Sequence, residues 1–262
     1  MQLRPIYTEP DNCQDCYKCI RECPVKAIRM ENNQASIIED RCIYCGHCTQ
    51  VCPTGAKKIR DGLTRAKLTL AQNTKVILSL APSYVSEFEG IHSSILIAAI
   101  KRLGFTNVSE TALGAELVTD RTERFLEEAE NGVYISSACP VVVEYIRKYS
   151  PDHVRFITPI ISPMLAHAKI LKQLYGEEVK IVFAGPCICK KLEADYFNNL
   201  VDVVITFKDL KKWFEQADIN LKNIAPNQPE ARFVPYRSGL GAYYPIEGGM
   251  LKGMHELSLI HI

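Results

Sequence analysis

The sequence predicts a small, cysteine-rich α+β domain followed by a larger α/β domain, whose core is a parallel sheet with flanking helices. Two observations lead to this fold class. Eight of the eleven cysteines lie before residue 53, whereas the other three are spread through the rest of the chain. From residue 75 onward, short β-branched runs alternate with stretches of helical periodicity. We expect a first domain over residues 1–62, a linker over 63–73 and a second domain over 74–262.

Charge and hydropathy argue against several classes of protein. The chain has 31 Lys and Arg against 30 Asp and Glu, without long blocks of either sign, so neither nucleic acid nor an acidic membrane surface is an expected partner. The longest apolar run, residues 95–100, is too short to cross a bilayer, and the first twelve residues hold no apolar export signal. A cytoplasmic protein is expected, whose reduced cysteines serve metal or redox chemistry.

The first domain contains a duplicated cysteine motif. Each block reads C-x-x-C-x-x-C-x-x-x-C-P, and the second block follows the first at an offset of 29 residues. Bacterial-type ferredoxins use this run to hold 4Fe–4S cubanes through four thiolates. Zinc is the competing interpretation, but zinc favours separated pairs of cysteines. Two 4Fe–4S clusters in a ferredoxin-like domain are therefore expected.

The spacing within a block lets three sulfur atoms converge on one cubane, so the fourth must come from elsewhere. In two-cluster ferredoxins it comes from the other block. The sequence therefore predicts two ligand sets that cross between the blocks. One set is Cys13, Cys16, Cys19 and Cys52, and the other is Cys42, Cys45, Cys48 and Cys23.

The second domain is predicted to have a doubly wound or related α/β layout. Gly104, Gly132 and Gly176 stand where C-terminal stops of helices are expected. The expected strands cover residues 76–80, 133–136, 179–183 and 201–206. The expected helices cover residues 91–103, 111–129, 141–149, 163–175 and 208–216.

Cys139 and Cys187 occupy corresponding places in this pattern. Each follows a predicted strand and adjoins a proline. Open α/β sheets bind ligands in the crevice outside the carboxyl ends of their strands. The two thiols are thus placed for a cofactor, although a lone cysteine is more often a small buried hydrophobe.

The segments around these cysteines resemble the signatures of one protein family. Ile135-Ser-Ser-Ala-Cys-Pro140 resembles the first signature of the catalytic domain of iron-only (FeFe) hydrogenases, which has a Thr-Ser-Cys-Cys-Pro core. Phe183-Ala-Gly-Pro-Cys-Ile-Cys-Lys-Lys-Leu-Glu-Ala194 resembles the second, Pro-Cys-x-x-Lys followed by a glutamate. A two-cubane module commonly precedes that domain, so the order of the features also matches.

The resemblance implies an H-cluster, which is a 4Fe–4S cubane joined through a cysteine sulfur to a two-iron centre. It implies ferredoxin hydrogenase activity on H₂ and protons, with electrons from a redox partner protein passing through the two ferredoxin cubanes. Cys139 and Cys187 would supply the first two thiolates of the H-cluster cubane, and Lys190 would donate to a cyanide of the two-iron centre. A lysine is more often a solvated surface charge, and Cys189 is expected to be structural.

The sequence departs from the family in two places. No cysteine follows Cys189, so the third signature, which supplies the last two cubane ligands, is absent and a C-terminal truncation is expected. Ala138 stands where hydrogen-producing members carry a proton-relaying cysteine, and this replacement resembles the sensory branch of the family. The competing prediction is a non-enzymatic electron carrier or iron–sulfur assembly factor with a hydrogenase-like fold.

Overall fold

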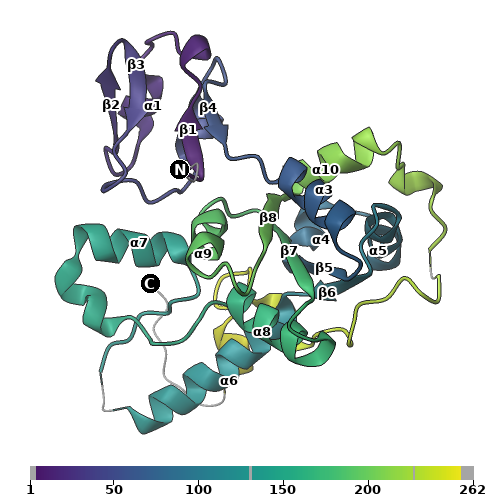
Figure 1. Ribbon diagram of the computed structural model, residues 1–262. Helices are drawn as coiled ribbons and strands as arrows, with labels where there is room; N and C mark the ends of the chain where they lie inside the picture. The colour runs from purple at the N-terminus through teal and green to yellow at the C-terminus, as the bar shows by residue number, and fades with distance from the viewer. Residues whose placement is uncertain (1–3, 130–131, 227, 255–262) are drawn as a thin grey trace.

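The computed structural model describes residues 4–129, 132–226 and 228–254 (Figure 1). A small N-terminal domain lies beside helices α7 and α9 of a larger α/β domain (Figure 1). The fold class predicted from the sequence is therefore confirmed. No helix in the described ranges combines the length and apolar character that crossing a membrane would need.

The first domain consists of two antiparallel strand pairs and two short helices that pack together. Strand β1 pairs with β4, and β2 pairs with β3 through a two-residue loop. The loop residues Asn32 and Asn33 have φ angles of 50° and 59°, as a type I′ hairpin turn requires. The elements are β1 (Ile6–Thr8), α1 (Lys18–Glu22), β2 (Ile28–Glu31), β3 (Gln34–Ile37), α2 (His47–Val51) and β4 (Lys57–Ile59).

The second domain is built on a four-stranded parallel sheet with the strand order β6-β5-β7-β8. All five residues of β5 are buried, because this central strand has neighbours on both edges and helices over its faces. The strands are β5 (Val76–Leu80), β6 (Asn107–Glu110), β7 (Lys180–Gly185) and β8 (Val203–Thr206).

Helices α6 and α8 make the most extensive helix pair of this domain. Gly114 permits their close approach, since a Cβ atom there would lie 2.2 Å from the carbonyl oxygen of Pro163. The helices are α3 (Leu63–Gln72), α4 (Tyr84–Glu87), α5 (Ser93–Arg102), α6 (Ala112–Glu128), α7 (Pro140–Tyr149), α8 (Pro163–Tyr175), α9 (Lys190–Tyr196) and α10 (Phe207–Gln216).

One predicted strand, at residues 133–136, is wrong. Val133 is 72% exposed, and the segment makes only the isolated bridge between Ile135 and Ile157. The fourth strand of the sheet is β6 instead. Its polar residues Ser109 and Glu110 are buried and hydrogen-bonded to other elements, so the strand lacks the apolar run that marks its neighbours.

The segment expected to be a linker, residues 63–73, differs from that prediction, because most of it is helix α3. Asp61 Oδ1 accepts hydrogen bonds from the amides of Leu63 (2.8 Å) and Thr64 (3.2 Å), which stabilises the start of the helix. Leu63 and Ala66 then enter the core of the α/β domain. The polar residues that suggested a linker form the outer face of this helix.

Several polar contacts join the two domains. Arg60 makes a bidentate ion pair with Asp195, with nitrogen–oxygen distances of 2.7 and 2.9 Å, and it also donates to the carbonyl of Lys191. At the end of α7, Lys148 donates to the carbonyl of Cys42 and the Tyr149 hydroxyl donates to the carbonyl of Arg41. The first domain is therefore held at both α7 and α9.

Replacing Arg60→Met should loosen this interface. The paired side chains of Arg60 and Asp195 are only 9% and 16% exposed, and breaking a buried pair from one side typically costs about 3–5 kcal/mol. We expect faster limited proteolysis between the domains and a separation of their thermal transitions. The control is Arg65→Met, because Arg65 is exposed on α3. Equal proteolysis of the two variants would contradict the structural role of Arg60.

Candidate iron–sulfur sites

Two cavities in the first domain are each lined by four cysteines. Each cavity takes three cysteines from one sequence block and one from the other. The crossing arises because helices α1 and α2 pack side by side, which brings the last cysteine of each block to the opposite loop. One cavity is lined by Cys13, Cys16, Cys19 and Cys52, and the other by Cys23, Cys42, Cys45 and Cys48.

The backbone of both cysteine loops adopts the same unusual conformation. In the first block Asp15 and Tyr17 have φ angles of 56° and 57°, and in the second block Tyr44 and Gly46 have φ angles of 52° and 86°. The pairs are related by the 29-residue offset of the motif. Non-glycine residues rarely occupy this left-handed region, and such strain is concentrated at functional sites. Because left-handed residues recur at equivalent positions of the two loops, we infer that each loop is shaped around its cavity.

The donor groups at these cavities suit 4Fe–4S cubanes. Backbone amides donate to cysteine sulfurs at 3.3 Å (Ala27 to Cys23) and 3.4 Å (Tyr44 to Cys42). Thiolates with amide donors are the ligand environment that protein cubanes use. Among the described residues, no three His, Cys, Asp or Glu side chains are grouped as for a single metal ion. The thiols instead surround two spaces, as the ligands of a cubane do.

Burial affects the titration of these thiols. It raises the pKa of Cys42 to about 11 and that of Cys48 to about 12. At Cys52 burial is outweighed by hydrogen bonds from Lys57, Thr54 and Ala56, and the pKa is lowered. A buried thiolate is therefore disfavoured at Cys42 and Cys48 until a positive partner such as iron compensates it.

The loop of the second cavity touches the α/β domain directly. A Cβ atom on Gly46 would lie 2.4 Å from Cδ1 of Ile188, which stands between Cys187 and Cys189. Ile188, Cys189 and Leu192 pack in the hydrophobic core of the first domain. The second cavity is thus adjacent to the segment that carries Cys187.

Cys139 and Cys187 lie near each other at one edge of the α/β domain. Cys187 follows β7, and Cys139 is the N-cap residue of α7 and is exposed. The pKa of Cys187 is raised, mainly by burial. The nearby Cys139 adds to this rise, and the charge of Lys190 opposes it. The strand expected before Cys139 is absent from the described residues, so this thiol is positioned by the start of α7 instead.

Lys190 is not a solvated surface charge. Its ammonium lies 2.6 Å from Glu193 Oε2 and 3.4 Å from the carbonyl oxygen of Ala138, and the residue is 8% exposed. The side chain therefore reaches from the start of α9 to the residue before Cys139. This geometry puts the ammonium beside both predicted cysteines.

The comparisons with known proteins follow the same division of the chain. Residues 74–259 match the family model described as the iron only hydrogenase large subunit, C-terminal domain, and residues 5–53 match the 4Fe–4S dicluster domain. The chain belongs to the iron-only hydrogenase large-subunit family. The dicluster match implies two 4Fe–4S clusters in the first domain.

Relatives in this hydrogenase family cover the chain to different extents. The NADP-reducing hydrogenase subunit HndD of Solidesulfovibrio fructosivorans is 24% identical, over 94% of this chain and 50% of the relative. The cytosolic Fe–S cluster assembly factor NAR1 of Meyerozyma guilliermondii is 27% identical, over 59% of this chain and 33% of the relative. A solved apo FeFe-hydrogenase HydA1 from Chlamydomonas reinhardtii has 25% identity and a TM-score of 0.56, over 66% of this chain and 51% of that one. The chain spans about half or less of the length of each of these relatives.

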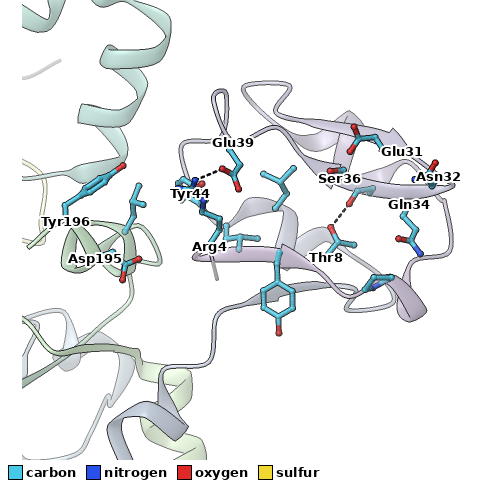
Figure 2. Close-up of a pocket in the computed structure, with 16 residues that line it drawn as sticks. Arg4, Thr8, Glu31, Asn32, Gln34, Ser36, Glu39, Tyr44, Asp195 and Tyr196 are labelled. Atoms are coloured by element: carbon cyan, nitrogen blue, oxygen red, sulfur yellow. Dashed lines mark hydrogen bonds and ion pairs between the residues drawn. The ribbon is translucent and has the colours of Figure 1, made fainter. Parts of the chain in front are cut away.

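A groove lies between the two domains of this family member, and its lining contains no cysteine (Figure 2). Figure 2 shows Arg4 and Glu39, which form an ion pair at 2.6 Å, on the side of the first domain and Asp195 and Tyr196 on the side of α9. The groove is therefore separate from the three groups of thiols. Cys189, expected to be structural, is fully buried in the core that the first domain shares with α9.

Sequence reasoning missed the residues that join the cysteine loops to their surroundings. Lys57 lines the first cavity, and Lys148 binds the backbone at Cys42 from the far end of α7. Lys57 could have been found from the repeat. It stands 29 residues after Ile28, so the second block has a charged residue where the first block has an apolar one. No local signal marks Lys148, since its partner is 106 residues away.

Proposed function

We propose that this chain belongs to a sensory-type iron-only hydrogenase, in which two ferredoxin cubanes exchange electrons with an H-cluster. The observation that carries the proposal is the contact between Gly46 and Ile188. It places the loop of the second cavity against the segment that bears Cys187. Electron transfer by tunnelling needs short steps, and this contact provides one between the domains. An external redox partner protein would exchange electrons with the first domain.

The H-cluster site is only partly present in this sequence. Cys139 and Cys187 would supply two of the four thiolates of its cubane, and no cysteine follows Cys189. These residues do not by themselves fit a complete H-cluster. A complete cubane of this kind needs two further ligands, and the chain spans about half the length of the relatives it matches.

At this site the residues of the chain hold the ammonium of Lys190 in place. Lys190 is oriented by Glu193 and would present its ammonium to an anionic ligand of the two-iron centre. Ala138 offers no thiol to carry protons and contributes only its carbonyl to Lys190. Slow turnover of H₂ and protons follows, and this supports a sensing role over fast hydrogen production.

Infrared spectroscopy tests the proposal. The reading frame is extended from the source DNA, and the protein is matured anaerobically with a two-iron precursor. We expect carbonyl and cyanide bands that disappear in a Cys187→Ala variant and persist in a Lys58→Gln variant, whose side chain lies on the first domain. A protein that binds its ferredoxin cubanes and shows no such bands would refute the hydrogenase proposal.

The similarity to NAR1 supports a second candidate, an iron–sulfur assembly factor that keeps the fold without the two-iron centre. The DNA downstream of codon 262 distinguishes the two. An in-frame Cys-x-x-x-Cys pair together with the infrared bands favours the hydrogenase. Bound cubanes without infrared bands in the extended protein favour the assembly factor.

A further inference from the structure

Lys57 is a buried cation whose hydrogen-bond partners are neutral. It is 4% exposed, and its Nζ donates to Thr8 Oγ1 (2.5 Å) and to the carbonyl oxygen of Ala35 (2.7 Å). Within the described ranges no carboxylate forms an ion pair with it, and Asp15, which lines the same cavity, is exposed. Burying an ammonium group without a counter-charge is costly. A negative partner at this cavity would remove that cost.

Comparison of the two blocks of the duplicated motif shows that only the second has a charged residue at this position. The equivalent residue of the first block is Ile28, which lines the second cavity together with other apolar side chains. Lys57 stands at the matching position of the first cavity, and its ammonium binds Thr8 and Ala35, which also line that cavity. Near the second loop, the charge of Lys148 is compensated by Glu144 at 2.9 Å. The two cavities therefore differ by one buried ammonium group, which the first has and the second lacks.

Lys57 is also coupled to the cysteines of the first cavity. Its ammonium binds the carbonyl of Ala35, and the amide of the same residue donates to Cys13 Sγ at 3.5 Å. Burial raises the pKa of Cys19, and the charge of Lys57 opposes that rise. The charge also acts on Cys48 of the second set, but Lys57 lines only the first cavity.

We propose that Lys57 is the counter-charge of the first cubane and sets its reduction potential above that of the second. Reduction of a cubane adds one electron and therefore one negative charge. A fixed ammonium at the cavity wall stabilises that charge most strongly in the nearer cluster. An added electron then resides preferentially on the first cubane, on the side away from the contact between Gly46 and Ile188. The proposal rests on the assignment of two cubanes to the first domain.

Redox titration followed by electron paramagnetic resonance tests the role of Lys57. In Lys57→Gln the equilibrium constant for reduction of the higher-potential cluster should fall about tenfold, which is 59 mV for a one-electron couple. The lower-potential cluster should shift less. Lys57→Arg, which keeps the charge, should restore the higher potential. A lower-potential cluster that shifts as much or more, or two unchanged potentials, would overturn the proposal.

Two further variants separate charge from structure. Thr8→Val removes a hydrogen-bond partner of Lys57 but keeps the ammonium, so the equilibrium constant for reduction of the higher-potential cluster should change by no more than about twofold. Lys58→Gln removes a partly exposed charge on the same strand, paired with Glu9 at 3.4 Å, and should shift neither potential. If Thr8→Val lowers the potential as much as Lys57→Gln, the side chain acts as a structural clamp and the proposal is wrong. Iron content near eight per chain in each variant shows that the clusters themselves are present.

Discussion

The double variant Cys16→Ala/Cys23→Ala should lose both ferredoxin clusters, although both changes lie in the first block of the motif. Cys16 lines the first cavity and Cys23 lines the second. Each substitution therefore removes a ligand from a different cubane. Iron bound after anaerobic reconstitution should fall from about eight atoms per chain to near zero.

The matched double variant Cys16→Ala/Cys52→Ala should keep one cluster. These two cysteines line the same cavity although they lie in different blocks. About four iron atoms per chain should remain. The exposed residue Cys139 lines neither cavity, so Cys139→Ala should retain about eight and controls for nonspecific loss. If the results of the two double variants were reversed, each block would bind its own cluster and the crossed assignment would be wrong.

The cysteine sets could be predicted because spacing and repetition are local properties of a sequence. The four thiols of each set are brought to one cavity by the packing of α1 on α2, and the repeat of 29 residues already implies two such loops. The crevice thiols Cys139 and Cys187 could be located only approximately. The start of α7, and not a strand, places Cys139 beside Cys187.

Strands could be predicted only where burial coincides with apolar residues. Residues 76–80 and 179–183 read as strands because most of their side chains are apolar and enter the core directly. Strand β6 does not, since Ser109 and Glu110 satisfy their polar groups through distant partners. Val133 is apolar but exposed, so the same criterion predicted a strand where none forms. Interdomain contacts such as that of Arg60 with Asp195 depend on residues 135 positions apart and leave no local pattern.

His167 should make the α/β domain lose stability as the pH falls. The imidazole is fully buried on α8, where Nδ1 lies 2.8 Å from the hydroxyl of Ser79 on β5 and Nε2 lies 2.8 Å from the hydroxyl of Ser109 on β6. Burial lowers its pKa from 6.5 to about 3. The folded domain therefore holds this residue neutral, whereas the unfolded chain binds a proton below pH 6.5.

The free energy of unfolding decreases as the pH falls, because the unfolded chain takes up a proton at His167 that the folded domain does not. The contribution of neutral His167 is complete above pH 6.5 and decreases as the pH falls from 6.5 through about 3, by up to about 5 kcal/mol in all. Between pH 7 and 5 about 2 kcal/mol should be lost. Urea unfolding measures this change through the fluorescence of Trp213, the only tryptophan in the chain, which lies in the same core as α8.

A glutamine at this position should abolish the His167 part of the pH dependence, because its amide can still donate and accept hydrogen bonds but does not titrate. The His167→Gln variant will have lower stability at pH 7, since the amide cannot match the ring in a closely packed site. Its unfolding free energy should nevertheless decline less steeply than that of the unchanged chain, by up to about 1.4 kcal/mol per pH unit below 6.5. His153→Gln, at an exposed histidine, should keep the original slope. Equal slopes for His167→Gln and the unchanged chain would mean that the imidazole takes up its proton without unfolding, and that the hydrogen bonds to Ser79 and Ser109 rearrange around a charged ring.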